Sequence, residues 1–370
     1  MDIFDRLDQE YEQVVFFTDA ASGLRAIVAI HSTALGPALG GTRCYPYASE
    51  DDAVTDVLRL ARGMTYKSAA AGLDLGGGKA VILGDPATVK SEQLLRTYAR
   101  FVHGLAGRYI TAEDVGTTQP DMDMIRRETP YVTGVSRSLG GSGDPSAATA
   151  YGVLHAMKAV ARHLWGDASL RDRRVVVSGV GKVGYSLARH LVEERATVLV
   201  ADIKPDAVSR ARHDLGVEVV PTGDATAVAC DIFSPCALGG VLNDETIPML
   251  DCAAVVGCAN NQLARPDDAA ALDKAGVLYA PDFVVNAGGV INIAQELVGY
   301  HRERAYANVR RIFDTTASVI EQAATEGITT SAAAEQLAER RMAGIAGTKL
   351  IRTYESTTEG RAIASKGAAR

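Results

Sequence analysis

The chain has 370 residues, of which 47% are hydrophobic and 22% charged, a composition typical of a globular protein long enough for two domains. Its formal net charge of -7 argues against non-specific binding to nucleic acid or to anionic membranes. Because no segment has the uninterrupted apolar length of a membrane span and the first residues lack an apolar signal core, we expect a cytoplasmic protein with neither nucleic-acid nor membrane partners.

The five cysteines are odd in number and include no C-x-x-C pair. This spacing supports neither a disulfide framework nor a zinc site. We therefore expect buried structural thiols and assign no metal ligands.

The first predicted elements are two strands, Val14 to Phe17 and Leu24 to Ile30, joined as a hairpin around residues 19–23. The segment that follows, Leu35 to Arg43, is rich in glycine. We expect a loop there whose exposed backbone suits a small ligand, and a purely structural turn remains the alternative.

Ser49, followed by acids at positions 50 to 52, predicts the start of a helix. Apolar residues recur at helical spacing as far as Met64, and the segment Met64 to Lys67 is expected to close the helix. Lys67 continues the apolar side. Its ammonium group therefore either meets an anion or extends along the surface into water.

Three glycines, Gly76 to Gly78, precede Lys79, and the apolar run Ala80 to Leu83 predicts a buried strand. We expect the glycines to let the backbone approach a ligand closely and Lys79 to lie at the mouth of that strand. A lysine among apolar groups and beside a second cation, Lys67, loses proton affinity and can act as a base. An ordinary surface lysine after a glycine turn is the alternative.

A helix is predicted from Ser91 to Leu105, followed by a strand from Tyr109 that runs into Glu113 and Asp114. Neighbouring residues of an extended segment point in opposite directions, so only one of these acids can face inward. We expect that residue to be Asp114. A solvated strand end is the alternative.

The segment Ser136 to Gly143 is a candidate hinge, and an alanine-rich helix is predicted from Ser146 to His163. Next come a strand (174–178), the glycine pattern Gly179-x-Gly181-x-x-Gly184, a helix through Glu194, a strand (197–201) and Asp202. This order is the context that a dinucleotide-binding fingerprint requires. Asp202 would bind the adenosine ribose and repel a 2'-phosphate, which favours NAD over NADP, and Lys204 is the one nearby feature that weakens this preference.

Further strands are predicted at 230–233, 253–256 and 277–279, alternating with helical segments as in a doubly wound sheet. The loops that follow these strands lie where such sheets bind ligands, and they carry the amides Asn260 and Asn286. Turn or cap formation is the alternative role for these amides. Two helices, 302–327 and 331–356, are expected at the end of the chain.

Six motifs in matching order resemble those of the glutamate, leucine, phenylalanine and valine dehydrogenase family, and most of all the actinobacterial valine dehydrogenases. They are Leu35-Gly-Pro-Ala-Leu-Gly-Gly-Thr-Arg43, Met64-Thr-Tyr-Lys67, Gly76-Gly-Gly-Lys79, Thr111-Ala-Glu-Asp-Val-Gly116, Cys236-Ala-Leu-Gly-Gly240 and Asn286-Ala-Gly-Gly289. The match extends from about Tyr11 to Ser356.

The resemblance implies an α/β fold with a substrate-binding and oligomerisation domain (1–140), a doubly wound Rossmann NAD-binding domain (141–325) and a C-terminal helix that packs back on the first domain (326–356). A disordered tail is expected over 357–370. The family's active site lies in the cleft between the domains, and its members suggest a homo-oligomer.

The resemblance also implies roles for single residues. Lys67 pairs with the substrate carboxylate, Lys79 is the catalytic base, and Asp114 handles protons on the substrate amine. Hydride passes from the amino-acid α carbon to NAD, Lys79 assists the attack of water on the iminium, and the product is a 2-oxo acid plus ammonium. Every step is acid-base or electrostatic, so no metal is needed.

Cofactor contacts carried over from the family are Thr149, Gly179, Val180, Gly181, Lys182, Val183, Gly184, Asp202, Cys258, Ala259, Asn260 and Asn286. One departure stands at Gly143-Asp144-Pro145-Ser146, where relatives have a serine in place of the proline. A potential hydroxyl contact is lost there, and the proline stiffens the hinge instead.

The family's substrate pocket corresponds to Leu39, Gly40, Gly41, Ala112, Val290 and Ile293. None of these carries a charge, so a glutamate side chain would be buried without a partner. Phenylalanine-preferring relatives have smaller residues at the positions of Leu39 and Val290, which favours branched aliphatic substrates, valine ahead of leucine and isoleucine. The alternatives are a leucine or phenylalanine dehydrogenase of the same family, a hydroxy-acid dehydrogenase, and a catalytically silent NAD-binding regulator.

Overall fold

The computed structural model describes residues 11–346, which form two compact units. Within that range the first unit holds residues 11–143, 296–300 and 339–346, and the second holds residues 144–295 and 301–338. The division after Gly143 lies close to the expected boundary at residue 140. The two units differ from the expected domains in two places. Residues 296–300 belong to the first unit, and the last helix, α14 (Thr330–Ala346), is divided between the units after Ala338. The expected tail, 357–370, lies outside the described residues.

Among residues 11–346, no helix is long and apolar enough to cross a membrane.

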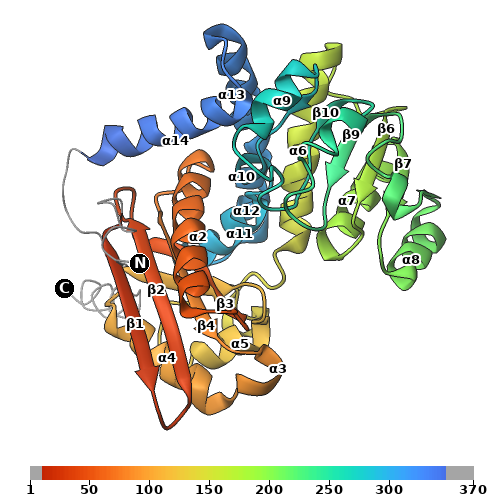
Figure 1. Ribbon diagram of the computed structural model, residues 1–370. Coiled ribbons are helices and arrows are strands. Elements are labelled where there is room, and N and C mark those ends of the chain that lie inside the picture. The colour runs from red at the N-terminus through yellow and green to blue at the C-terminus, as the bar shows by residue number, and fades with distance from the viewer. Residues whose placement is uncertain (1–10, 347–370) are drawn as a thin grey trace, which may run out of the picture. The chain divides into compact units, whose positions relative to one another are not determined.

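The first unit is built on a five-stranded mixed sheet with the order β1-β2-β4-β3-β5 (Figure 1). Its strands are β1 (Gln13–Asp19), β2 (Leu24–Ser32), β3 (Ala38–Tyr45), β4 (Gly76–Leu83) and β5 (Tyr109–Glu113). The expected hairpin is confirmed, because β1 pairs antiparallel with β2 and Asp19 faces Leu24 across the turn. β4 runs antiparallel to β2, whereas β3 runs parallel to both β4 and β5.

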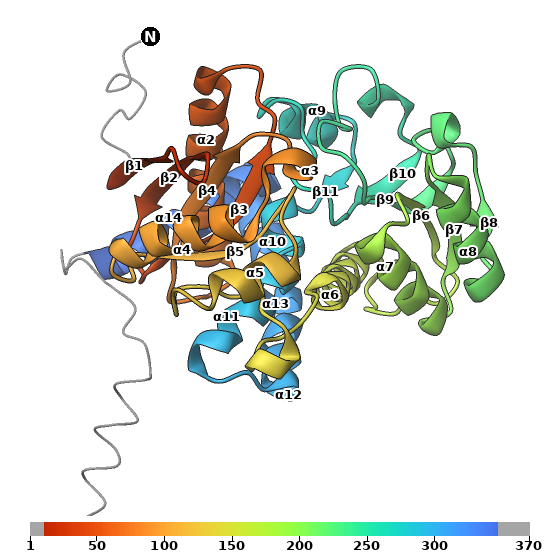
Figure 2. The ribbon, with the colours of Figure 1, turned by 90° about the horizontal axis from the view of Figure 1, so that it is seen from below.

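Two helical layers cover this sheet on opposite faces (Figure 2). α2 (Glu50–Ala70) buries Val54, Val57 and Leu58 against one face, together with Val81 of β4. α4 (Glu92–Gly104) and α5 (Gln119–Ile125) cover the other face, where Ala80 and Ile82 of the same strand are buried. Side chains alternate along β4, so Gly77, Lys79 and Val81 all lie on the α2 side.

The start of α2 agrees with its sequence signal, but its end does not. The Ser49 side chain accepts a hydrogen bond from the Asp52 amide at 3.1 Å, as an N-cap residue should. The helix was expected to close at Lys67, yet it continues to Ala70. At its far end, Arg341 of α14 donates to the Ala69 and Leu73 carbonyl oxygens at 3.2 and 2.6 Å.

Two glycine-rich segments expected to lie outside strands belong to strands, and both expectations were therefore wrong. The segment 35–43 contributes most of β3, and Gly76 to Gly78 begin β4. Glycine has a low intrinsic preference for strands, but close packing requires glycine at these positions. A Cβ atom on Gly77 would overlap the Thr65 backbone of α2, and one on Gly40 would overlap the Gly78 carbonyl.

The second unit contains a six-stranded, fully parallel sheet with the order β11-β10-β9-β6-β7-β8. Its strands are β6 (Arg174–Ser178), β7 (Thr197–Ala201), β8 (Glu218–Val219), β9 (Cys230–Pro235), β10 (Cys252–Val255) and β11 (Leu278–Tyr279). Numbered from β6, this is the order of the doubly wound Rossmann sheet, which reverses between β6 and β9. The expected fold class is confirmed.

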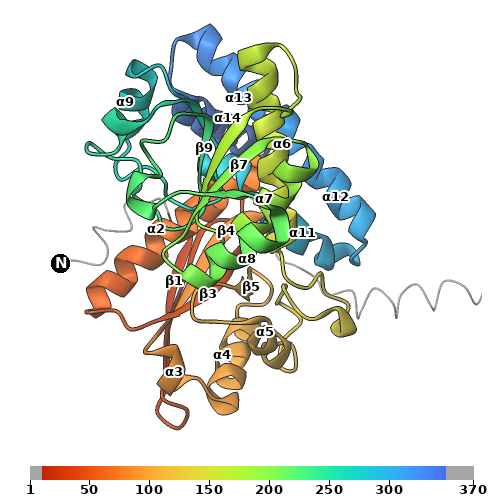
Figure 3. The same cartoon turned by 90° about the vertical axis from the view of Figure 1, so that its right-hand side faces the viewer.

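Helices flank the second sheet, and α6 (Ser146–Trp165) packs against α7 (Lys182–Glu193) and α13 (Ile312–Glu326) (Figure 3). The helix expected over 302–327 is two helices, α12 (Arg302–Arg310) and α13. The remaining helices of the described chain are α3 (Pro86–Val89), α8 (Pro205–Leu215), α9 (Asp268–Lys274), α10 (Asp282–Val285) and α11 (Gly288–Ala294). Short 3-10 turns are η1 (Arg137–Leu139), η2 (Thr222–Asp224), η3 (Ile247–Met249) and η4 (Gln295–Val298).

Candidate active site

Lys79 and Asp114 form a buried ion pair in the first unit. Lys79 lies within β4, where only 4% of its surface is exposed, and its Nζ donates to Asp114 Oδ2. It was expected at the mouth of a strand, beside the cation Lys67, but the partner that the structure places against it is a carboxylate. Asp114 directly follows β5 and faces inward, as its position in the sequence predicts.

Gly41 of β3 creates the space in which this pair forms. β3 lies between β4 and β5 in the sheet, so the Lys79 side chain crosses it to reach Asp114. A Cβ atom on Gly41 would stand 2.6 Å from the Glu113 carbonyl oxygen and 2.8 Å from the Asp114 Cβ. These distances are shorter than normal contacts, so only glycine at this position leaves Asp114 in place.

Arg43 holds the second oxygen of Asp114. Its Nε donates to Asp114 Oδ1 at 3.2 Å, and its Nη1 donates to Asp56 of α2 at 2.8 Å. Burial by itself raises the pKa of Asp114, but the positive charges of Lys79 and Arg43 outweigh it and hold that pKa below its usual value. The carboxylate is therefore ionised at neutral pH.

Sequence reasoning assigned no role to Arg43, although it lies in one of the quoted motifs. A signal was present, because Gly41 and Arg43 are two residues apart on a strand and so share a face. That signal could not be used while the segment was interpreted as a loop. Lys67 lies in the last turn of α2 and is partly exposed.

The expected pocket residues of the first unit lie on the same strands as the ion pair. Leu39 and Gly41 share the α2-facing side of β3, and Ala112 of β5 is 3% exposed. Gly40 points to the opposite side, where the Tyr109 hydroxyl donates to its carbonyl oxygen at 2.6 Å. Its structural effect is to let β3 and β4 approach closely.

The glycine fingerprint of the second unit connects β6 to α7. Gly179 has a φ of 109°, a conformation that favours glycine, and a Cβ atom on Gly184 would overlap the Gly179 carbonyl oxygen. A Cβ atom on Gly181 would meet no described atom within 4 Å. Gly181 is also the N-cap of α7, so no side chain of the cap residue occupies the start of the helix. This arrangement suits a pyrophosphate.

Asp202, at the end of β7, is anchored to the same loop. Its Oδ2 accepts from the Val180 amide and its Oδ1 from the Lys204 amide, each at 2.8 Å. A carboxylate has about four acceptor positions, so two remain for ribose hydroxyls. Lys182, the first residue of α7, pairs with Asp144 at 2.9 Å, and Val183 follows it in the helix.

A group of amides stands at the carboxyl ends of β10 and β11. Asn286 donates from Nδ2 to Asn260 Oδ1 at 2.9 Å and to the Cys258 carbonyl at 3.2 Å. Ala259 lies between these two partners and its carbonyl oxygen accepts from Asn286 Nδ2 at 3.5 Å. Asn286 Oδ1 is buried and has no hydrogen-bond partner among the described residues. An unsatisfied buried oxygen is costly, and a bound carboxamide would satisfy it.

The start of α11 lies against the start of α6, which carries Thr149. A Cβ atom on Gly288 would overlap the Ala148 carbonyl oxygen, and one on Gly289 would lie 2.7 Å from Thr149 Oγ1. The two glycines therefore allow α11 to approach α6 closely. Val290 is buried and Ile293 is partly exposed on the same helix.

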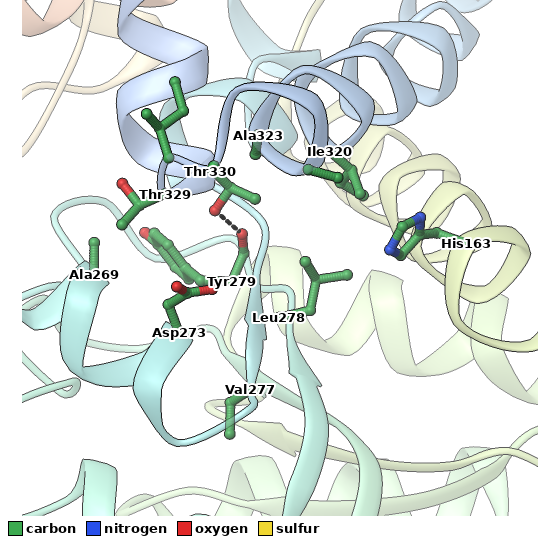
Figure 4. Close-up of a pocket in the computed structure, with 13 residues that line it drawn as sticks. His163, Ala269, Asp273, Val277, Leu278, Tyr279, Ile320, Ala323, Thr329 and Thr330 are labelled. Carbon is green, nitrogen blue, oxygen red and sulfur yellow. Dashed lines mark hydrogen bonds between the residues drawn. The ribbon is translucent and has the colours of Figure 1, made fainter.

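A separate cavity of about 340 Å³ in the second unit contains none of the predicted site residues (Figure 4). It is lined by His163 of α6, by Tyr279 and by Thr330, whose hydroxyl donates to the Tyr279 carbonyl at 2.5 Å. His163 lies fourteen residues beyond Thr149 on α6, which corresponds to about 21 Å along the helix axis. None of the residues that line the cavity belongs to the dinucleotide loop at 179–184, so the two are distinct.

Comparisons with known proteins identify the family. Residues 11–131 match the model of the Glu/Leu/Phe/Val dehydrogenase dimerisation domain, and residues 140–208 and 200–354 match the Glutamate/Leucine/Phenylalanine/Valine dehydrogenase model. The chain belongs to this family. As a member of the Glu/Leu/Phe/Val dehydrogenase family it is an amino-acid dehydrogenase, and the resemblance seen in its motifs is confirmed.

Relatives and solved structures in this family match nearly the whole chain. It is 53% identical to a leucine dehydrogenase of Geobacillus stearothermophilus over 92% of this chain and 94% of that protein. It is 55% identical to a valine dehydrogenase of Streptomyces coelicolor over 90% of this chain and 92% of that protein. The crystal structure of L-tryptophan dehydrogenase from Nostoc punctiforme superimposes with a TM-score of 0.82 at 41% identity, covering 94% of this chain and 100% of that one.

Proposed function

We propose that this family member catalyses the NAD-dependent, reversible oxidative deamination of branched-chain L-amino acids, with L-valine preferred. The observation that carries the proposal is the buried Lys79–Asp114 ion pair, which Arg43 and Gly41 hold in one geometry. Acid-base chemistry on an amine needs a lysine and a carboxylate that are fixed close together and shielded from water.

The roles of the residues follow from their charges. Lys67 pairs with the substrate carboxylate, and Asp114 moves protons at the substrate nitrogen. Lys79 Nζ takes a proton from the water that attacks the α carbon. That proton then passes through the Asp114 carboxylate to the substrate nitrogen, which departs as ammonia. NAD, when bound, serves as the acceptor of the hydride.

The cofactor proposal rests on the fit of the second unit to NAD. The open N-terminus of α7 suits the pyrophosphate, and the unpaired Asn286 Oδ1 suits the carboxamide. Asp202 suits ribose hydroxyls and disfavours a 2'-phosphate. Thr149, Cys258, Ala259 and Asn260 remain proposed contacts around the nicotinamide.

Replacing Asp202 by alanine is expected to weaken NAD binding about 10- to 100-fold, because a hydrogen bond to a charged group contributes about 1.5 to 3 kcal/mol. The preference for NAD over NADP should narrow at the same time, since the charge that repels the 2'-phosphate is gone. Titration calorimetry with both cofactors measures the two effects. Asp206→Ala, an exposed acid in the first turn of α8, is the matched control. An unchanged NAD affinity in Asp202→Ala would remove Asp202 from the site.

The substrate proposal rests on the uncharged character of the pocket residues. Leu39 and Ala112 are apolar and buried in the first unit, and Val290 and Ile293 are apolar in the second. A second carboxylate, as in glutamate, would meet no partner among them. One methylene changes binding by only about 1 to 3 kcal/mol, so valine, leucine and isoleucine should overlap as substrates.

A kinetic panel tests the substrate proposal. The oxidation rate is measured at mildly alkaline pH, with NAD and with NADP, for valine, leucine, isoleucine, phenylalanine, alanine and glutamate. We expect valine with NAD to have the highest kcat/KM and glutamate to be turned over very slowly. Phenylalanine above all three branched substrates would overturn the pocket argument. Reduction of the 2-oxo acid should require ammonium, which a hydroxy-acid dehydrogenase would not need. Inactivity with all six amino acids, with NAD binding intact, would indicate a regulator.

The assembly and location also belong to this proposal. We infer a homo-oligomer because residues 11–131 match a dimerisation domain. The cytoplasmic location expected from the sequence stays a prediction.

A further inference from the structure

Four of the five cysteines form two thiol pairs in the second sheet, which differs from the buried structural thiols expected from the sequence. Cys44 is buried, whereas Cys230, Cys236, Cys252 and Cys258 are partly exposed. Cys236 and Cys258 lie on the two segments that follow β9 and β10, and Cys230 and Cys252 face each other where these strands begin.

The Cys236–Cys258 pair stands at the carboxyl ends of the same two strands. Cys236 directly follows β9, and its sulfur lies 3.4 Å from the Ser234 hydroxyl. Cys258 follows β10, and its Sγ also lies 3.9 Å from the Cys236 carbonyl oxygen. The Cys258 thiol therefore already contacts the Cys236 residue in the folded chain.

The backbone holds this pair in place on both sides. The Ala259 amide donates to the Pro235 carbonyl at 3.0 Å, and the Cys236 amide donates to the Ser178 carbonyl at 2.8 Å. A Cβ atom on Gly257 would overlap the Pro235 oxygen, so the chains approach as closely as glycine permits. Two cysteines on adjacent, closely held segments meet the distance requirement of a disulfide.

Each cysteine of this pair also touches the cofactor machinery. A Cβ atom on Gly184, the last glycine of the fingerprint, would lie 3.2 Å from the Cys236 Cβ. The Cys258 carbonyl accepts from Asn286 Nδ2 at 3.2 Å. A covalent bond has a sulfur-sulfur distance of about 2.05 Å, much shorter than a contact between two thiols. Closing it would therefore shift the fingerprint loop or the Asn286 amide.

We propose that Cys236 and Cys258 form a reversible disulfide that lowers the affinity of this enzyme for NAD. The inference rests on the proposed function, since it assigns the neighbouring loops to NAD. The neighbouring Cys258 side chain lowers the pKa of the Cys236 thiol, so Cys236 is the thiolate that reacts first.

A peroxide is the oxidant. The Cys236 thiolate attacks one peroxide oxygen and breaks the O–O bond, giving a sulfenic acid and releasing hydroxide, which takes a proton to become water. The Cys258 sulfur then attacks the sulfenic sulfur and displaces the second oxygen, which also leaves as water. Two thiols lose two hydrogens and two electrons, and one peroxide becomes two waters. A dithiol reverses the change.

The test treats the full-length enzyme with hydrogen peroxide and measures its NAD dissociation constant by calorimetry before and after reduction with dithiothreitol. Peptide mass mapping locates any linkage. We expect a Cys236–Cys258 linkage, and we expect the dissociation constant for NAD to rise at least about tenfold and to return on reduction. Each variant is compared with its own reduced form.

The other thiol pair supplies the matched control. Cys230 lies six residues before Cys236, about 20 Å away along the strand, so Cys230→Ser should respond to peroxide as the unmodified enzyme does. Cys258→Ser should lose the response. A linkage that leaves NAD binding unchanged, or peroxide treatment that gives no Cys236–Cys258 linkage, overturns the inference. If the reduced enzyme itself binds no NAD, the proposed function fails, and peptide mapping shows separately whether the disulfide forms.

Discussion

Lys79→Ala is expected to lower kcat for valine oxidation about 100- to 10,000-fold, because a positioned acid-base group contributes about 10²- to 10⁴-fold to the rate. The substitution also leaves Asp114 with Arg43 as its remaining side-chain partner, which removes the pairing that fixes the carboxylate. NAD binding should persist, since every proposed cofactor contact lies in the second unit. Steady-state kinetics and calorimetry with NAD measure the two quantities on the same sample.

Loss of a buried charge partner can also destabilise the fold, so a control is required. Lys90→Ala removes another lysine from a partly buried lysine-aspartate pair of the first unit, where Lys90 Nζ donates to Asp121 at 2.7 Å. It should leave kcat within a few-fold of the original value. If Lys79→Ala kept more than a tenth of the activity, Lys79 would not be the catalytic base.

Gly41→Ala is expected to lower kcat/KM at least about 100-fold, although glycine and alanine differ by one methyl group. The added Cβ atom would stand 2.8 Å from the Asp114 Cβ and 3.0 Å from its Oδ2. Asp114 or the Glu113 backbone must therefore move, and a displacement of about 1 Å at a catalytic group costs about 10²-fold. We expect the free energy of unfolding to fall by about 1 to 3 kcal/mol as well, as for other overpacked sites.

Gly63→Ala is the matched control for this variant. Gly63 lies in α2 of the same unit, and a Cβ atom there meets no described atom within 4 Å. Alanine favours a helix over glycine by about 1 kcal/mol, so this variant should keep its activity and gain stability. Full activity in a folded Gly41→Ala enzyme would show that the space at Gly41 is not needed for the ion pair. Urea unfolding and kinetics on both variants distinguish the two effects.

The elements that were predicted correctly are those whose signals are local. The Ser49 cap, the hairpin of β1 and β2 and the strand-glycine-helix order around Gly179 each depend on residues close together in the sequence. Periodicity and turn chemistry express such information directly. The family motifs added the proposal that Lys79 and Asp114 act in acid-base chemistry.

The errors share one cause. The glycines of β3 and β4 indicated positions outside strands because glycine is unfavourable in isolated strands, whereas their actual role is to admit the α2 backbone and the neighbouring strands. Arg43 was missed as a partner of Asp114 because 71 residues separate them. The thiol pairs were missed because Cys236 and Cys258 are 22 residues apart and meet only at neighbouring strand ends.

The sequence by itself determined the fold class, the dinucleotide fingerprint and the residues that suit acid-base chemistry, since these depend on residue type and local spacing. Only the tertiary structure decided that Lys79 lies within a strand, that its partner is a carboxylate held by Arg43, and that Gly41 makes room for both. The physical reason is that contacts across a sheet depend on strand order and register. Long-range packing sets both of these, and no local pattern records them.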